Sequence, residues 1–327
     1  MAQVKRLLRL LIGGLLAAAC TLVFAQVAAP YPSKPVRLVT GFPGGGPTDL
    51  MARVLGEKLQ AIWKQPIIVE ARPGASGALS MEQLKNAPPD GYFLLMAPTN
   101  TMAVNPHLFP KLAYDPLKDF TLIARAANID NVLTVNPSVP AKSLQELAAL
   151  ARGKPGELTF GSPANGSQAH LAGEFLNQHF GIKMVHVPYK GVGPAMNDLI
   201  GGQISMMFVP VANALPHIRS GKLLPIAIPT RERNASIPDV ATFAQQGIPG
   251  FEAVTWFMLI APAGLPAEVT AKIRADTATV LRDPDLRERL RAFGADPGAV
   301  GEDLAAFLRA DLARWGQVVR AAGIKAD

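Results

Sequence analysis

Short β-branched runs alternate along the chain with stretches that carry apolar residues at helical spacing. Residues 36–40 predict a strand, 41–47 a loop and 49–64 an amphipathic helix. The same order of strand, loop and helix returns over 159–180. Repeated strand–loop–helix units predict an α/β fold with largely parallel sheets.

The same two patterns predict further elements. Strands are expected over 67–70, 92–97, 132–135, 184–187, 204–208 and 223–228, and helices are expected up to Leu84 and over 143–152, 195–199 and 215–219. Ser143 and Glu146 form a capping box at the start of one of these helices. The segment 229–250 is rich in turn formers and polar residues, so we expect it to cross between two lobes.

The tail from Pro266 is predicted to be mostly helical, and its last helix has a strongly apolar face. That face must pack on a surface of matching size, which the sheet of the first lobe provides. The chain is therefore expected to leave its first lobe, build a second and return. We predict a discontinuous lobe I of residues 26–127 plus 254–327 and a lobe II of residues 128–253. Two connections between lobes act as a hinge, and the cleft between them is the natural ligand site.

Residues 1–25 have the pattern of a secretory signal peptide. Three basic residues precede an apolar run over 10–19, which is shorter than the roughly 20 residues of a membrane span. The small residue Ala25 favours cleavage before Gln26, so the sequence predicts a periplasmic protein. Cys20 leaves an alternative open, because the residues before it loosely match a lipoprotein box that would anchor the chain by lipid.

Composition excludes several classes of protein. The chain has 327 residues but one cysteine, so it can form neither a disulfide framework nor a multi-cysteine zinc or iron–sulfur site. The formal net charge is +7, and removal of the predicted signal peptide takes away three basic residues and no acid, which leaves +4. The other basic residues stand beside acids along helices, which is typical of solvated faces. We expect no nucleic-acid partner.

Two glycine-rich loops follow predicted strands and precede predicted helices. The first is 42–49 (FPGGGPTD) and the second is 161–167 (GSPANGS). Free N–H groups at a helix start carry partial positive charge, and glycine lets a ligand approach them, so such loops bind anions. The alternative is that these residues only form tight turns with a helix cap, supplied by Thr48 or Asp49 in the first helix and by Ser167 in the second.

Motifs for nucleotides, catalysis and metals are incomplete. The first loop lacks the lysine of a P-loop, and Met196 stands where a dinucleotide fingerprint needs glycine. Ser76 lies in an incomplete nucleophile elbow, and Ser167 with His170 fits a helix cap better than a nucleophile with its base. The five histidines form no HExxH or i,i+4 pair. We expect no enzyme activity, no cofactor and no metal site.

Seven motifs occur in a fixed order along the chain. They are 31–35 (YPSKP), 42–49, 70–77 (EARPGASG), 89–92 (PDGY), 136–137 (NP), 166–174 (GSQAHLAGE) and 187–191 (VPYKG). This order resembles the substrate-binding proteins of tripartite tricarboxylate transporters, the Bug or TctC-like receptors. The resemblance implies a two-lobed periplasmic-binding-protein fold of type II, a Venus flytrap, which closes on a small carboxylic acid and delivers it to integral membrane transporter subunits.

The resemblance also implies which residues bind the ligand. One loop from each lobe would hold the carboxylate through backbone amides and ordered waters rather than through an arginine. A monomer is expected, with no catalytic residue. The implied ligand-binding residues are Phe42, Gly44, Gly45, Gly46, Thr48 and Asp49 in the first loop, Ser162, Asn165, Gly166 and Ser167 in the second, and Thr99, Asn100 and Thr101 in a further wall of the cleft.

The chain departs from the pattern of this family at four positions. Gly44 replaces a proline, Ala71 an asparagine and Ala164 a glycine. Val209 stands where an acid or amide often contacts the ligand, which disfavours an amino acid and favours a plain, partly apolar carboxylate. Two alternatives stay open: a receptor of the same fold that serves a sensor protein, and a secreted hydrolase or isomerase that uses the cleft.

Overall fold

The computed structural model describes residues 30–323. The predicted signal peptide, its cleavage site before Gln26 and the cysteine at position 20 lie outside the described residues. The chain divides into two units, with the boundary between Ser33 and Lys34. All helices and strands described below belong to the second unit.

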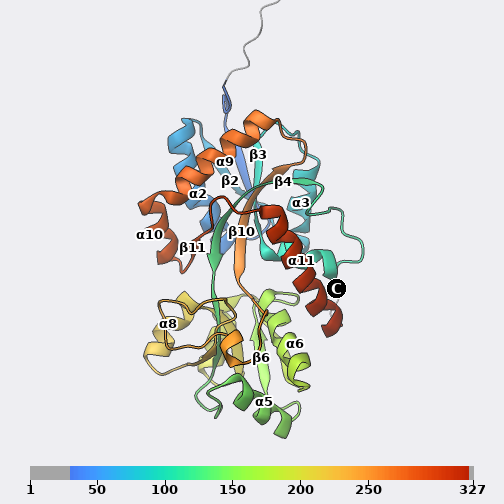
Figure 1. Ribbon diagram of the computed structural model, residues 1–327, viewed down its shortest axis with the longest axis vertical. Helices are drawn as coiled ribbons and strands as arrows, with labels where there is room; N and C mark the ends of the chain where they lie inside the picture. Colours follow the sequence, from blue (N-terminus) through green and yellow to red (C-terminus); the bar gives the residue numbers. More distant parts are fainter. Residues whose placement is uncertain (1–29, 324–327) are drawn as a thin grey trace, which may run out of the picture. The chain divides into compact units, whose positions relative to one another are not determined.

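A six-stranded sheet, which we call sheet A, contains strands from both ends of this unit (Figure 1). Strand β1 pairs parallel to β2 and β3, whereas β10 lies antiparallel between β3 and β4. The strand order is β11-β4-β10-β3-β1-β2. The strands are β1 (Val36–Thr40), β2 (Ile67–Ala71), β3 (Phe93–Pro98), β4 (Phe120–Ile129), β10 (Thr255–Pro262) and β11 (Asp296–Pro297).

A five-stranded sheet, sheet B, is formed entirely by the middle of the chain. Its order is β7-β6-β8-β5-β9, with β6 parallel to β7 and β8 and with β5 antiparallel to β8 and β9. The chain therefore passes between the sheets twice, at Asp130 and again between β9 and β10. The strands are β5 (Asn131–Val135), β6 (Thr159–Ser162), β7 (Val185–Pro188), β8 (Met206–Pro210) and β9 (Leu224–Ala227).

The α/β fold with two lobes was predicted, but the expectation of largely parallel sheets is wrong. Both sheets are mixed. Strand β4 leaves sheet A toward sheet B and β10 returns, so these neighbours must run in opposite directions (Figure 1). Neither strand was predicted, because their apolar runs lack the period-two alternation of a half-buried strand. The predicted lobe boundaries at 127/128 and 253/254 stay a prediction.

Helices cover the sheets and match most predicted ranges. Helix α2 packs on β1 and β2, and α9 packs on β4 and α2. No helix in the described part of the chain is both long and apolar enough to cross a membrane. The helices are α2 (Pro47–Trp63), α3 (Ala78–Lys85), α4 (Asn105–Leu108), α5 (Leu144–Gly153), α6 (Gln168–Phe180), α7 (Val192–Ile200), α8 (Val211–Arg219), α9 (Ala267–Arg282), α10 (Pro284–Ala292) and α11 (Leu304–Ala322), with single turns at η1 (Ala75–Gly77), η2 (Asn100–Val104) and η3 (Ala244–Gln246).

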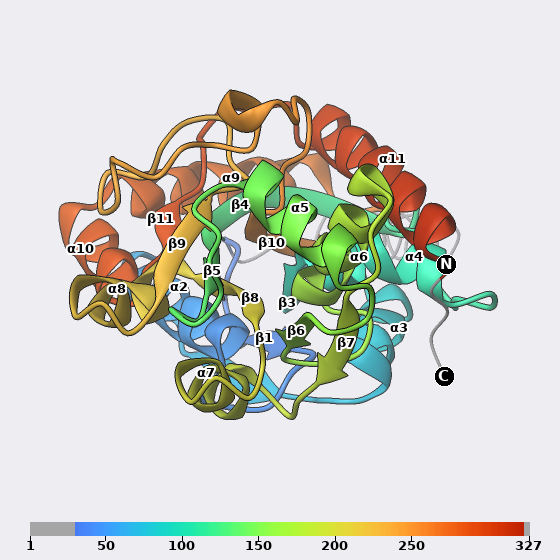
Figure 2. The same cartoon turned by 90° about the horizontal axis from the view of Figure 1, so that it is seen from below.

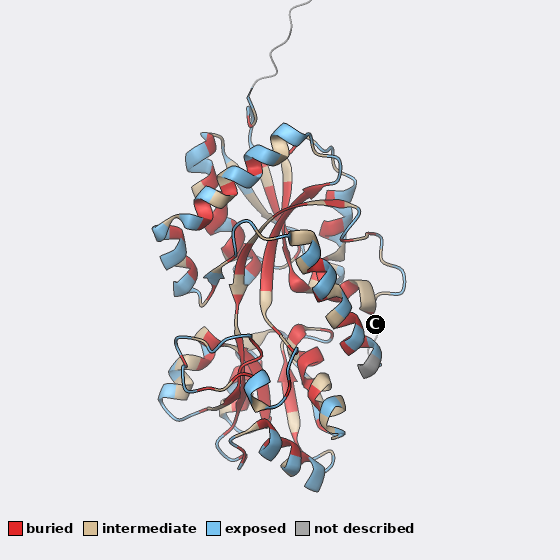
Figure 3. Cartoon of the chain, in the orientation of Figure 1, coloured by how far each residue is buried: buried red, intermediate tan, exposed pale blue. Residues whose placement is uncertain are grey.

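Sheet B has an apolar cluster on each face. Met206 and Phe208 of β8 belong to the cluster that includes residues of α5 and α6, whereas Met207 and Val209 belong to the cluster formed with α7 and α8. Figure 2 shows these helix pairs on opposite sides of the sheet, and Figure 3 shows the buried residues concentrated along the strands. Alternate residues of one strand therefore supply two separate cores.

The last helix packs on sheet A, as predicted, and also on α6 of the second lobe. Its Phe307 meets the ring of Trp256 on β10 edge to face at 5.4 Å. Trp315 is fully buried and lies 6.5 Å from the ring of Phe251. The apolar face that the sequence predicted thus contacts both lobes rather than one.

Candidate ligand-binding loops

The first glycine-rich loop connects β1 to α2. Gly46 is the N-cap of the helix, and no side chain caps its first turn. The predicted cap at Thr48 or Asp49 is wrong, because Pro47 begins the helix earlier and leaves both residues inside it. Gly45 has φ +80°, a conformation that favours glycine. The loop therefore ends at a helix start whose N–H groups have no side-chain acceptor.

Asp49 ties this loop to its helix. One carboxylate oxygen accepts hydrogen bonds from the Gly45 N–H at 3.0 Å and from the Arg53 guanidinium at 2.8 Å. Burial opposes ionisation of the group, but these bonds outweigh it and hold the pKa of Asp49 below its ordinary value. The second oxygen is buried and has no hydrogen-bond partner among the described residues.

The second loop connects β6 to α6. Ser167 caps the helix as predicted, since its hydroxyl accepts a 3.3 Å hydrogen bond from the His170 N–H. Gly166, with φ +66°, donates its N–H to Nδ1 of His170 at 3.0 Å. At the other end of the loop, the Ser162 hydroxyl lies 2.7 Å from Nε2 of His186. Both ends of the loop are thus held by histidines.

The hydroxyls of Thr99 and Thr101, two of the three predicted residues after β3, form hydrogen bonds with backbone groups of the protein. The Thr99 hydroxyl accepts from the Trp256 N–H at 2.8 Å and lies 3.3 Å from the Trp256 carbonyl. The Thr101 hydroxyl donates to the carbonyl of Pro98. Asn100 is the residue of this group that reaches the second loop, with its amide donating to the Gly166 carbonyl at 3.4 Å.

Contacts around two glycines bring parts of the predicted site together. A Cβ on Gly77 would lie 3.1 Å from the Phe42 ring and 2.6 Å from the Thr101 methyl. A Cβ on Gly166 would lie 2.7 Å from Leu108 of α4. Phe42 of the first loop and Thr101 of the segment after β3 therefore both lie beside Gly77. The second loop contacts α4, the helix that follows this segment.

Other predicted residues are placed differently. Val209 is fully buried in the cluster with α7 and α8. Gly44 and Asn165 are exposed, and a Cβ on Gly44 would meet no atom within 4 Å. The assignment of ligand-binding roles to these and the other predicted residues stays a prediction.

Sequence reasoning missed His186, Leu108 and Gly77. His186 approaches the loop because β6 pairs in parallel with β7 and places Phe160 opposite His186. Such a pairing between strands has no local signal in the sequence. Gly77 does have a signal, since it stands in the quoted motif 70–77 and requires φ +85°.

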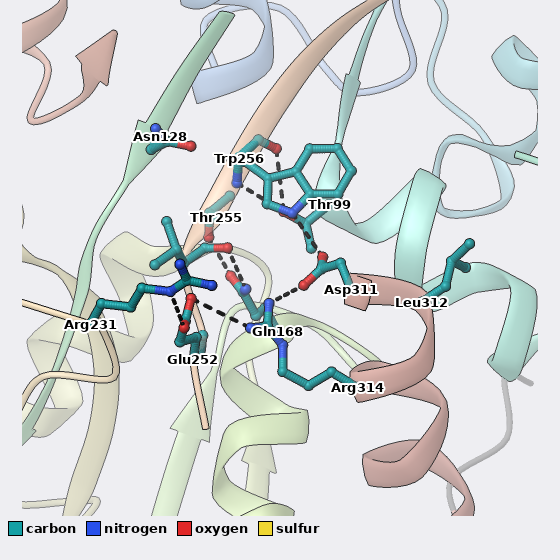
Figure 4. A network of polar contacts seen from close by, with 12 residues as sticks. Thr99, Asn128, Gln168, Arg231, Glu252, Thr255, Trp256, Asp311, Leu312 and Arg314 are labelled. Carbon is teal, nitrogen blue, oxygen red and sulfur yellow. Dashed lines mark hydrogen bonds and ion pairs between the residues drawn. The ribbon is translucent and has the colours of Figure 1, made fainter. Parts of the chain in front are cut away.

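A polar network joins the lobes beside the loops (Figure 4). Gln168, the first residue of α6, accepts from the Thr255 hydroxyl and donates to the carbonyl of Val254 at 2.8 Å. Asn131 donates to the carbonyl of Ala253 at 3.1 Å. The helix that follows the second loop is therefore bonded to the strand by which the chain returns to sheet A.

The same network continues to the C-terminal helix (Figure 4). Arg314 of α11 contacts the Asp311 carboxylate and lies 3.6 Å from Glu252, which also pairs with Arg231 at 2.7 Å. Burial raises the pKa of Asp311 above its ordinary value. The pair between Arg314 and Glu252 crosses from α11 to the segment between β9 and β10.

A cavity of about 690 Å³ lies away from both loops. It is lined by β4, α9 and the start of α11, including Arg274, Glu302 and Arg309, and by none of the predicted ligand-binding residues. Among the described residues, no group of three or more His, Cys, Asp or Glu side chains could hold a metal ion.

A family model described as "Tripartite tricarboxylate transporter family receptor" matches residues 51–324. The chain belongs to this family. Its members are periplasmic solute-binding receptors rather than enzymes. The predicted resemblance and the predicted fold class are thereby confirmed.

Several relatives match nearly the whole chain. Protein BugT of Bordetella pertussis is 35% identical over 308 residues, which cover 92% of this chain and 94% of BugT. The structure of R. palustris Rpa4515 with adipate has a TM-score of 0.78 at 32% identity and covers 90% of this chain and 99% of its own. MatC from Rhodopseudomonas palustris with bound malate has a TM-score of 0.74 at 34% identity and covers 88% of this chain and 100% of its own.

The contact between Ser162 and His186 has the distance of a nucleophile with its base, but its polarity is reversed. The Ser162 hydroxyl donates its single proton to the carbonyl of Ala164 at 2.8 Å. The imidazole must then donate to the hydroxyl oxygen instead of withdrawing its proton. In this arrangement the pair holds one end of the loop, and the serine proton is directed at a carbonyl instead of at the imidazole.

Proposed function

We propose that this chain is a periplasmic receptor that captures a small carboxylic acid between its two glycine-rich loops and delivers it to integral membrane transporter subunits. One observation carries the proposal: the second loop, from sheet B, meets the segment after β3 of sheet A through Gly166 and Asn100. The first loop, also from sheet A, meets the same segment at Gly77, so both loops border it. A ligand that bridges them stabilises the arrangement in which they are close, by its differential affinity for that arrangement.

The chemistry of the first loop suits a carboxylate. The first turn of α2 has no side-chain cap, so its N–H groups can donate to an anion. Asp49 fixes Gly45 and leaves Gly44 exposed. Since relatives of this chain were solved with adipate and with malate, we favour a dicarboxylate.

The remaining parts of the proposal concern export and mechanism. We infer that residues 1–25 direct the chain to the periplasm and are removed before Gln26, and that the mature protein acts as a monomer. Lobe I would comprise residues 26–127 plus 254–327, and lobe II residues 128–253. Closure would turn about the two crossings between the sheets.

A thermal-shift screen followed by calorimetry tests the function. The panel is acetate, benzoate, malate, adipate and citrate, with glucose and sodium chloride as controls. An acid present at 100 times its dissociation constant should add about 2.7 kcal/mol to the free energy of unfolding. Stabilisation by the controls and by no acid would overturn the proposal.

Two further measurements separate the proposed receptor from its alternatives. Proton NMR of the bound acid should show no product, whereas turnover would indicate a hydrolase or isomerase. Loss of uptake of the acid on deletion of the gene supports transport. Unchanged uptake with a lost transcriptional response would instead identify a receptor that serves a sensor.

A further inference from the structure

Two imidazole rings lie face to face behind the second loop. The centroids of His170 on α6 and His186 on β7 are 3.6 Å apart and their planes differ by 5°. The Phe160 ring of β6 lies 6.2 Å from the first and 5.0 Å from the second. His170 is 7% exposed. The rings form a stacked pair between the loop and the apolar core of sheet B.

Each ring holds one end of the loop. Nδ1 of His170 accepts the Gly166 N–H at 3.0 Å, so this nitrogen carries no proton. Nε2 of His186 donates to the Ser162 hydroxyl, whose own proton goes to Ala164. Both contacts are satisfied when both rings are neutral and protonated at Nε2.

The surroundings of the pair favour this neutral state. Burial lowers the pKa of His170 to about 4, and burial together with the neighbouring His170 lowers the pKa of His186 to about 4. The described ion pairs give the rings one charged neighbour, Glu174 of α6, whose carboxylate lies 3.9 Å from His170. The neighbours from β6 are uncharged, namely Phe160 and Ser162.

The pair acts on the contact between the lobes through Gly166. The N–H of this glycine is bonded to His170, and its carbonyl accepts the Asn100 amide from the other lobe. A proton on Nδ1 of His170 removes the acceptor for the N–H. Two protonated rings would also place like charges at stacking distance. Either event releases the backbone that faces Asn100.

We propose that His170 and His186 are positioning residues for the second ligand loop, and that tight binding of a carboxylate requires both rings to be neutral. The inference rests on the proposed function, because it assumes that this loop binds the acid. The ligand would contact the loop, and the histidines would act on the ligand only through Ser162 and Gly166.

Four variants separate hydrogen bonding from ring stacking. His170→Phe and His186→Phe keep an aromatic ring but lose the bonds, and each should weaken the tightest-binding acid of the panel about 3- to 10-fold at pH 7.5. His170→Asn offers an acceptor near the position of Nδ1, and His186→Gln a donor near the position of Nε2, so both should bind nearly as the wild type does. His179→Phe, an exposed position on the same helix, is the control and should change nothing.

The pH profile separates positioning from a general effect on folding. From pH 6 to pH 4, the affinity of the wild type should fall further than protonation of the acid itself explains. The double variant His170→Asn/His186→Gln should lose this additional fall. Phenylalanine variants that bind as the wild type does, or a wild-type affinity that rises on acidification, would overturn the proposal.

A measurement without ligand keeps this inference distinct from the proposed function. Long-range proton–nitrogen NMR of the histidine rings at pH 7 should show both as Nε2–H tautomers, and the Gly166 amide should titrate together with His170. An Nδ1–H tautomer at His170, or a Gly166 amide that does not titrate, would refute the positioning role. If no acid of the panel binds, the proposed function fails and the NMR result still decides on the histidine pair.

Discussion

The indole N–H of Trp256 donates a 2.8 Å hydrogen bond to the buried carboxylate of Asp311. This bond ties α11 to β10, the strand by which the chain returns from the second lobe (Figure 4). Trp315 lies on the same helix and is equally buried, but its indole nitrogen has no hydrogen-bond partner among the described residues. The two tryptophans therefore form a matched pair in which one makes the bond and the other does not.

Trp256→Phe should destabilise the protein more than Trp315→Phe does. Both substitutions remove the same ring volume from the core, but only the first leaves a buried carboxylate without its indole donor. The difference in the free energy of unfolding should be about 1–3 kcal/mol, measured by urea denaturation. Equal losses in the two variants would mean that the bond to Asp311 contributes no net stability.

Gly166→Ala should impair both stability and ligand affinity. The new alanine would have to keep φ at +66°, and its Cβ would lie 2.7 Å from the Leu108 side chain. Gly181→Ala is the control, because φ there is +59° and a Cβ would meet nothing within 4 Å. The control should lose about 1 kcal/mol of unfolding free energy from backbone strain alone.

The clash at position 166 can be tested by a second substitution. Leu108→Ala removes the atom that the new Cβ would meet, so the double variant should recover part of the lost affinity. Calorimetric titration with the acid measures this recovery. If Gly166→Ala binds as tightly as Gly181→Ala does, the contact between the second loop and α4 has no role in binding.

Gly44→Val should abolish ligand binding and leave the fold intact. A Cβ at this exposed position would meet no protein atom within 4 Å, so valine would obstruct only a ligand that approaches the backbone. Gly45 is a poorer site for this test, since its φ of +80° would strain valine. Gly193→Val is the control at an equally open position. Unchanged affinity with an unchanged melting temperature would remove the first loop from the site.

Asp49→Asn should weaken the connection between the first loop and α2. The variant loses a charged acceptor for Gly45 and Arg53, so we expect a loss of roughly 1–3 kcal/mol in the free energy of unfolding at pH 7.

The stabilisation by Asp49 should depend on pH. Because the folded pKa of Asp49 lies below its ordinary value, this stabilisation is present above the pKa of the unfolded chain and is lost as the pH falls through the folded pKa. The two proteins should therefore converge in stability in strong acid. A constant difference at all pH values would contradict this, and Asp239→Asn, an exposed position, serves as the control.

Features of the site that depend on neighbouring residues in the sequence could be predicted. The cap at Ser167 and the glycines between a strand and a helix follow from local backbone chemistry. The start of α2 was misplaced by two residues, because Pro47 at the first helical position and a polar cap at Thr48 or Asp49 are competing signals.

Features that depend on the pairing of strands could not be predicted. His186 meets Ser162 only because β7 joins β6 in one register, and a shift by one residue would turn the imidazole to the other face. Strand β10 was missed because a continuous apolar run does not distinguish a buried strand from a buried helix. Strand β4 was missed because its polar residues Thr121, Arg125 and Asn128 do not alternate with apolar ones. The antiparallel crossing, which gives the fold its two connections, therefore had no local signal.

The position of β10 also sets the order in which the chain can fold. This strand lies between β3 and β4, so sheet A stays in separate pieces until residues 255–262 have been synthesised. Sheet B, whose strands end at Ala227, is complete before that point. The first lobe thus begins to form first but is completed last. The long sequence separation between β3 and β10 slows the assembly of sheet A. A chain built in this way keeps its first lobe open until β10 has joined sheet A, which is the state that the export proposed above would require during passage across a membrane.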